Sequence, residues 1–196
     1  MILLRGAESG LEVLMLQRGT QARFMPGVWV FAGGVVEEFD RASAAATPVG
    51  GIEPDELAHR ICGARELGEE ASLEIGFDAL RPWSRWITPE QVPMRFDTRF
   101  YVGLAPAGAE PTHDPVEMAA ARWVDPERAL GDFAAGGFEL SFPTIKHLEE
   151  LRRFGDAEAV IAAAAARPVV PLTPKVIGTE DSFEVLLPGE PGYEEA

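Results

Sequence analysis

The chain has 196 residues and a mass of 21.2 kDa, which suffices for one domain with a sizeable core but not for two full domains. Its 17 Lys and Arg against 32 Asp and Glu give a formal net charge of −15, which argues against binding to nucleic acid, since that requires a cationic face. The single cysteine, Cys62, excludes an intrachain disulfide and fits a reducing compartment. The sequence has neither a membrane-length apolar run nor a signal-peptide pattern, so we expect a cytoplasmic protein that does not enter a membrane.

Short β-prone runs and helical patterns follow one another along the chain. We expect strands at residues 11–18, 28–31, 85–88, 96–104 and 121–124, and helices at residues 55–73, 126–135, 142–154 and 156–167. Because these elements mix without strict alternation, the predicted fold class is α+β with a mixed β-sheet.

Two segments carry no such pattern. Residues 37–54 are rich in Ala, Gly and Pro without a clear period, which indicates a loop or an insertion. Residues 168–196 are rich in proline and end acidic, so we expect an extended tail that lies along the body.

The helix at residues 55–73 has two distinct faces. At about 100° per residue, one face is apolar and is expected to pack on the sheet; it holds Leu57, Ile61, Ala64, Leu67 and Ala71. The opposite face is largely acidic and holds His59, Cys62, Glu66, Glu69 and Glu70. Neighbouring carboxylates disfavour a thiolate, so Cys62 is interpreted as an inert thiol.

Three carboxylates on this face lie one helical turn apart. Glu66 is three residues from Glu69 and four from Glu70, and such like-charge pairs destabilise a helix unless a cation neutralises them. Magnesium prefers hard oxygen ligands of this kind. On spacing alone, a solvated acidic helix face is the better explanation of the pattern.

The surroundings of the three acids are similar to the Nudix hydrolase motif, which runs Gly, five residues, Glu, seven residues, then R-E-U-x-E-E-x-G-U with U aliphatic. Its second half matches at Arg65, Glu66, Leu67, Glu69, Glu70 and Leu73, with Ser72 in place of the late Gly. Arg65 follows Gly34 by 31 positions where the motif has 14, which places 17 inserted residues in the segment 37–54. The early Glu falls in register on Leu57, so either Glu53 or Glu56 is expected to replace it.

A second motif precedes the helix. Nudix enzymes that cleave coenzyme A carry arginines and glycines at a spacing that is met here, with Gly19 and Ala32 as departures, by Arg18, Arg23, Gly27, Phe31, Gly33 and Gly34. Arginines beside a metal site can hold phosphate oxygens in a bidentate manner, although surface salt bridges would use the same residues. The resemblance extends through residues 87–100 and the tail at 186–189 to a Nudix branch with a long insertion, which includes coenzyme A diphosphatase-like members.

The resemblance implies a Nudix-like α/β/α sandwich in residues 1–167, with 37–54 inserted in the motif and 168–196 as a C-terminal extension. It implies that Mg²⁺ or Mn²⁺ is held by Glu66, Glu69, Glu70, the carbonyl of Gly34 and Glu117, with Arg65 orienting a ligand. Glu117, before the predicted strand at 121–124, is implied as a ligand or base. Arg18, Arg23, Gly27, Phe31 and Gly33 are the implied substrate-binding residues.

The implied activity is metal-dependent hydrolysis of a diphosphate linkage in a nucleoside diphosphate joined to another moiety, with coenzyme A or acyl-CoA as the candidate substrate. Two alternatives remain open. The incomplete first half of the motif would also suit a non-catalytic nucleotide-binding or sensory module, and the same fold carries other enzymes such as glycosylases and isomerases. The expected partner is a small diphosphate, and homodimers are frequent in the family.

Overall fold

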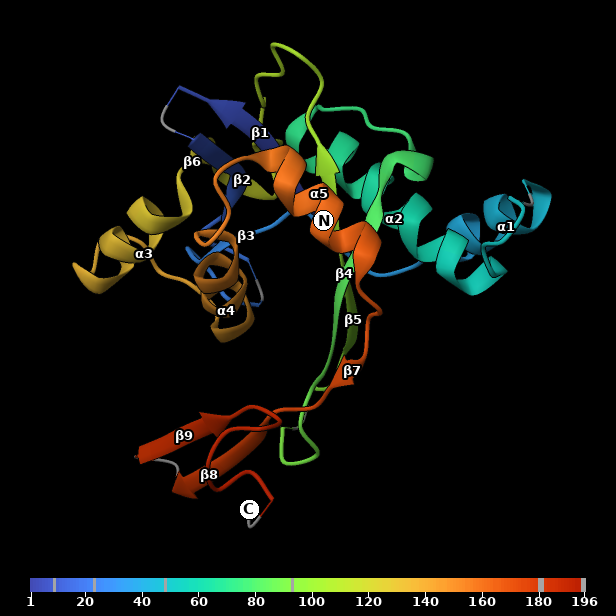
Figure 1. Cartoon of the computed structure of the whole chain (residues 1–196). Coiled ribbons are helices and arrows are strands. Elements are labelled where there is room, and N and C mark those ends of the chain that lie inside the picture. Colours follow the sequence, from blue (N-terminus) through green and yellow to red (C-terminus); the bar gives the residue numbers. More distant parts are fainter. Residues whose placement is uncertain (9, 23, 48, 93, 180–181, 195–196) are drawn as a thin grey trace.

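The computed structural model describes residues 1–8, 10–22, 24–47, 49–92, 94–179 and 182–194 (Figure 1). Its centre is a mixed sheet. The spatial order of strands is β3 (Trp29–Val30), β2 (Gly10–Arg18), β1 (Ile2–Ala7), β5 (Asp97–Leu104), β4 (Arg81–Ile87) and β7 (Pro171–Leu172), while β6 (Met118–Val124) also pairs with β2. The pairs β1–β5 and β4–β7 are parallel and the others are antiparallel, which confirms the predicted mixed sheet.

Alternation along the strands explains why helices cover both faces of this sheet. In β1, Ile2 and Leu4 belong to one buried cluster while Leu3 belongs to another, because successive side chains point to opposite faces. The first cluster includes residues of α3 (Pro126–Ala134), α4 (Phe142–Leu151) and α5 (Ala157–Ala166), and the second includes residues of α2 (Pro54–Ala71). The α+β sandwich expected from the sequence is therefore confirmed.

The segment 37–54 contains a helix, α1 (Glu38–Ala46), where the sequence predicted a loop. Its start is stabilised by the Asp40 carboxylate, which accepts a 2.9 Å hydrogen bond from the Glu37 backbone N–H. Alanines favour the helix thereafter. The periodicity was invisible because α1 buries only two residues, Asp40 and Ala44, and one of them is charged.

Helix α2 confirms the prediction for 55–73, but its buried face is rotated from the expected one. Glu70 and Cys62 are each only 4% exposed although both were placed on the acidic face, because the segment before α1 and α1 itself cover this side. The helix ends at Ser72, whose φ of 54° is left-handed and whose N–H donates to the Gly68 carbonyl. Ser72 thus adopts the C-cap conformation that glycine usually supplies.

The tail is more structured than predicted. After β7, the chain forms an antiparallel hairpin of β8 (Lys175–Thr179) and β9 (Ser182–Leu186), which stands beyond the end of the main sheet (Figure 1). The hydroxyl of Tyr193 donates to the Thr173 carbonyl at 2.7 Å and ties the chain end back to the start of the hairpin. A short 3₁₀ turn at Phe77–Ala79 completes the element list. Among the described residues, none of the helices has the length and apolar character needed to cross a bilayer.

Candidate functional site

The second half of α2 packs against a turn that contains two consecutive glycines. The backbone N–H of Gly33 donates a 2.9 Å hydrogen bond to the Glu70 carboxylate. A Cβ added at Gly34 would meet the Glu66 carboxylate, whose carbon would lie 2.5 Å away. Glycine at position 34 is therefore required for the turn to approach Glu66 this closely.

Arg65 connects the acidic residues of α2 to α1. Its Nη1 lies 2.8 Å from Glu66 Oε1 and 2.8 Å from Glu69 Oε2. Its Nε and Nη2 donate to the two carboxylate oxygens of Asp40, each at 3.1 Å. Burial is the largest influence and works against ionisation of Asp40, but the hydrogen bonds from Arg65 and from the Glu37 N–H, together with the charge of Arg65, hold the pKa of that carboxyl below its usual range. This planar, bidentate contact fixes the orientation of the guanidinium.

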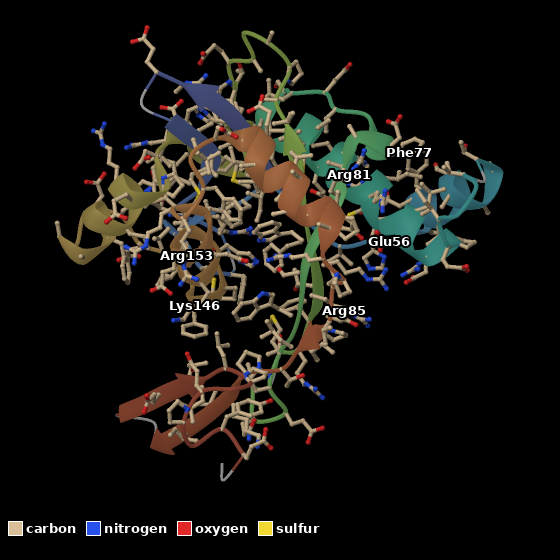
Figure 2. The ribbon with its side chains drawn as sticks, in the orientation of Figure 1. Glu56, Phe77, Arg81, Arg85, Lys146 and Arg153 are labelled. Carbon is tan, nitrogen blue, oxygen red and sulfur yellow. The ribbon has the colours of Figure 1, made fainter. Side chains whose placement is uncertain are left out.

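Asp40 is a site residue that the sequence analysis missed. Asp40 follows Gly34 by six positions, which is the spacing between the first Gly and the early Glu of the motif. Counting forward from Gly34 therefore identifies Asp40, whereas counting back from Arg65 leads to Leu57. The expected substitutes lie elsewhere. Glu56 faces the sheet, where it accepts hydrogen bonds from Arg99 and Tyr101 at 3.1 and 3.0 Å (Figure 2), and Glu53 is the N-cap residue of α2.

The carboxylates of Glu66 and Glu70 lie in an environment that disfavours their charged form. Burial raises the pKa of Glu70 to about 7, opposed by the Gly33 N–H and reinforced by the neighbouring charge of Glu66. Burial also raises the pKa of Glu66, and Arg65 only partly offsets it. A nearby cation would reverse this penalty. Glu69, by contrast, has a side chain that is 59% exposed.

Within the part of the chain that the structure describes, no three Asp, Glu, His or Cys side chains converge as a preformed metal cluster. The Arg65 guanidinium contacts both Glu66 and Glu69, and Glu70 is turned toward Gly33. The donor set nevertheless suits a hard divalent cation, since it consists of carboxylate oxygens beside the Gly33-Gly34 turn.

The loop between β2 and β3 borders these carboxylates. The positive charge of Arg18 acts on Glu70 and lowers its pKa slightly against the stronger effect of burial. The N–H of Gly19 donates to the Glu117 carbonyl at 2.8 Å, and the charge of Glu117 contributes to the raised pKa of Glu66. The structure therefore brings Arg18 and Glu117 to the rim of the site.

Other predicted substrate-binding residues are placed differently. Gly27, with a φ of 78°, closes the loop by donating its N–H to the Arg18 carbonyl at 3.1 Å. Phe31 is only 7% exposed and packs edge-on against Phe100 with ring centroids 6.5 Å apart, so its side chain belongs to the core. Arg23 lies outside the described residues.

Cys62 lies behind the acidic site. Burial raises the pKa of its thiol to about 11, and the charges of Asp40 and Glu66 add to the effect. The structure thus agrees with an inert thiol at this position.

Comparisons with known proteins agree with this architecture. The NUDIX domain profile matches residues 1–142. Putative nudix hydrolase 7 of Caenorhabditis elegans is 30% identical over 208 residues, covering 93% of this chain and 70% of that protein. Acyl-coenzyme A diphosphatase NUDT19 of Gallus gallus is 26% identical over 278 residues, covering 94% and 73%.

Among solved structures, a NUDIX hydrolase from Alicyclobacillus acidocaldarius superposes with a TM-score of 0.75 at 24% identity, over 85% of this chain and 95% of that one. This likeness shows the fold, and the profile match over most of the chain shows the family. The chain belongs to the Nudix hydrolase family and is a Nudix-type pyrophosphohydrolase.

Proposed function

We propose that the chain hydrolyses the diphosphate linkage of coenzyme A or an acyl-CoA, and that the reaction depends on Mg²⁺ or Mn²⁺. The observation that carries this proposal is the pair of partly desolvated carboxylates, Glu66 and Glu70, beside the Gly33-Gly34 turn. A bound cation would compensate the charge of two adjacent buried acids, and acids with raised pKa values in one place are candidates for a functional site.

The residues proposed to hold the ion are Glu66, Glu69, Glu70, the carbonyl of Gly34 and Glu117. A bound divalent ion supplies polarisation of the phosphoryl oxygens and acidification of a water. Arg65 is a positioning residue, since its Nη1 contacts Glu66 and Glu69 while Asp40 fixes the other edge of the guanidinium. Arg18 and Arg23 are proposed to hold phosphate oxygens of the substrate.

In the proposed reaction, a water oxygen bonds to phosphorus and the bridging P–O bond breaks. A carboxylate accepts the proton of the water; Glu117 is our candidate if it does not itself hold the ion, because it is exposed and its charge acts on Glu66. With coenzyme A the products are 3′,5′-adenosine bisphosphate and 4′-phosphopantetheine.

Two observations support coenzyme A as the substrate. The loop that joins Arg18 to Gly27 lies against the acidic site, with Gly19 bonded to the Glu117 carbonyl. Relatives named acyl-coenzyme A diphosphatase align over 94% and 95% of the chain.

The test uses a panel of coenzyme A, ADP-ribose, NADH and a dinucleoside polyphosphate with Mg²⁺, with products identified by mass spectrometry. Glu69→Gln and Glu70→Gln should each lower kcat on the preferred substrate by on the order of a hundredfold or more, because each removes a negative charge that would hold the divalent ion at the reacting centre. Glu74→Gln, just beyond α2 and exposed, is the matched control and should retain activity.

Undiminished turnover in the two variants would refute the site. Much faster cleavage of ADP-ribose or NADH than of coenzyme A would refute the substrate. Tight binding of the panel without any turnover would identify a non-catalytic module instead.

A further inference from the structure

Four large apolar side chains are exposed together on two loops. Phe24 and Met25, in the loop between β2 and β3, are 44% and 38% exposed, and Met94 and Phe96, in the loop between β4 and β5, are 57% and 42% exposed. The rings of Phe24 and Phe96 lie with centroids 6.0 Å apart, so the two loops touch. We call these four residues the apolar rim. Exposed clusters of this kind usually mark a binding surface.

Both halves of the apolar rim are held in place by hydrogen bonds. Thr88 accepts the Phe96 N–H through its hydroxyl at 3.0 Å and donates its own N–H to the Phe96 carbonyl at 2.9 Å. Arg18 Nε donates to the Phe24 carbonyl at 3.0 Å. Met25 has a φ of 49°, a left-handed conformation that costs a non-glycine residue energy. The loop therefore presents Phe24 and Met25 to solvent in a fixed and strained arrangement.

The apolar rim shares a loop with residues that border the acidic site. The same loop starts at Arg18, whose charge acts on Glu70, and at Gly19, which is bonded to the Glu117 carbonyl. Arg18 thus stands between the carboxylates on one side and Phe24 on the other. A ligand with an anionic diphosphate at one end and an apolar group at the other matches this order of surfaces.

We propose that the apolar rim binds the acyl chain of an acyl-CoA and makes the enzyme prefer acylated over free coenzyme A. This inference rests on the proposed function, because it assigns the diphosphate of the same substrate to the acidic site. The pantetheine arm of coenzyme A separates the thioester from the diphosphate, so the acyl group must be bound at a distance from the metal. Met25 and Met94 suit chains of different length, since methionine is flexible and polarisable.

The experiment compares kcat/KM for coenzyme A, acetyl-CoA and octanoyl-CoA. We expect the wild type to prefer octanoyl-CoA to coenzyme A by about tenfold or more, which corresponds to removing roughly two methylene groups from water. The double variant Phe24→Ser/Phe96→Ser should lose about tenfold of that preference. Phe133→Ser, which changes an equally aromatic residue that is 38% exposed on α3, should keep both the activity and the preference.

Equal kcat/KM for the three substrates in the wild type would overturn the apolar rim as an acyl site and leave the proposed function intact. Failure to cleave any of the three would refute the proposed function. In that case the affinities of the wild type for octanoyl-CoA and coenzyme A are measured at equilibrium. Equal affinities would overturn the apolar rim as an acyl site. A double variant that keeps the preference but changes from dimer to monomer in light scattering would identify the rim as a contact between two copies of the chain, which also overturns it.

Discussion

Gly34 and the Glu66 carboxylate approach each other so closely that a side chain at position 34 would have to displace this carboxylate. We expect Gly34→Ala to displace Glu66 from the turn and to lower kcat by about tenfold or more, because the added Cβ would lie 2.5 Å from the carboxylate carbon. Steady-state kinetics with Mg²⁺ measures this effect. Thermal unfolding should change little, since the clash falls on a partly exposed site and not on the core.

The neighbouring glycine provides the control. A Cβ at Gly33 would have its nearest neighbour 3.8 Å away, which is an ordinary contact. Gly33→Ala should therefore retain activity within about threefold. Equal losses in the two variants would mean that the turn as a whole, and not its approach to Glu66, limits activity.

At the residue scale, the sequence identifies the acidic side chains better than their surroundings. Glu66, Glu69 and Glu70 follow from a motif whose residues sit within two turns of one helix, so their proximity needs no knowledge of the tertiary fold. The burial of Glu70 and Cys62 depends on other segments that cover α2, and the helical period of α2 alone does not reveal them.

At the scale of helices and strands, the site depends on a contact between α1 and α2. Asp40 on α1 is fully buried and binds two nitrogens of Arg65 on α2. We expect Asp40→Ala to cost about 3 kcal/mol in the free energy of unfolding, because it removes a fully buried carboxylate and two charge-assisted hydrogen bonds to Arg65. Denaturant titration measures this loss. Because Arg65 is then held chiefly by Glu66 and Glu69, kcat should fall as well.

A surface pair of similar geometry is the matched control. Asp97 and Arg85 also make a two-nitrogen contact, one bond being 2.8 Å, but their side chains are 46% and 33% exposed. Asp97→Ala should cost less than about 1 kcal/mol. If Asp40→Ala were no more destabilising than Asp97→Ala, the contact between α1 and α2 would not be a structural requirement.

The strands β2 to β6 were predicted at or near their observed positions from their apolar content, but β1 was not predicted. The buried half of β1 is a continuous apolar run at residues 2–4, because its side chains enter both buried clusters. Helix α1 buries one alanine and one aspartate, so its sequence resembles a polar loop. The hairpin β8–β9 was predicted only as extended chain, because its two strands pair with each other and not with the main sheet.

On the scale of the whole molecule, one buried histidine makes stability depend on pH. His147 joins α4 to β4, with Nε2 at 2.6 Å from Ser84 Oγ and Nδ1 at 2.6 Å from the Pro143 carbonyl. Burial lowers its pKa from 6.5 to about 3. Between these values the unfolded chain binds a proton that the folded chain does not, so falling pH favours unfolding by roughly 1.4 kcal/mol per pH unit.

We therefore expect the wild type to lose stability between about pH 6 and pH 4 more steeply than His147→Gln, which has no group that titrates there. Thermal unfolding of both proteins over this range measures the difference, and the carboxylates common to both largely cancel. Parallel profiles would mean that His147 is already protonated in the folded chain.

The division of the chain is also a property of the whole molecule. We propose residues 1–167 as the Nudix domain and 168–196 as an extension. The profile match covers residues 1–142, and α4 and α5 beyond it pack into the same buried cluster as the sheet. The extension adds only the two residues of β7 to the main sheet. Together with β4, with α4, from which Lys146 projects, and with Arg153 just after α4 (Figure 2), it lines a cleft of about 490 Å³. Proline content indicated an extension, but not the surface against which it folds.

The place of α1 has a consequence for finding related chains. Asp40 contacts Arg65 through space, so the loop that joins α1 to α2 can be longer without breaking this contact. The entropic cost of closing a loop grows only with the logarithm of its length. Searches keyed to fixed intervals along the chain would reject homologues that differ here. A search for the geometric triplet of a glycine bend, an acid and a guanidinium would retrieve them whatever the length of the intervening segment.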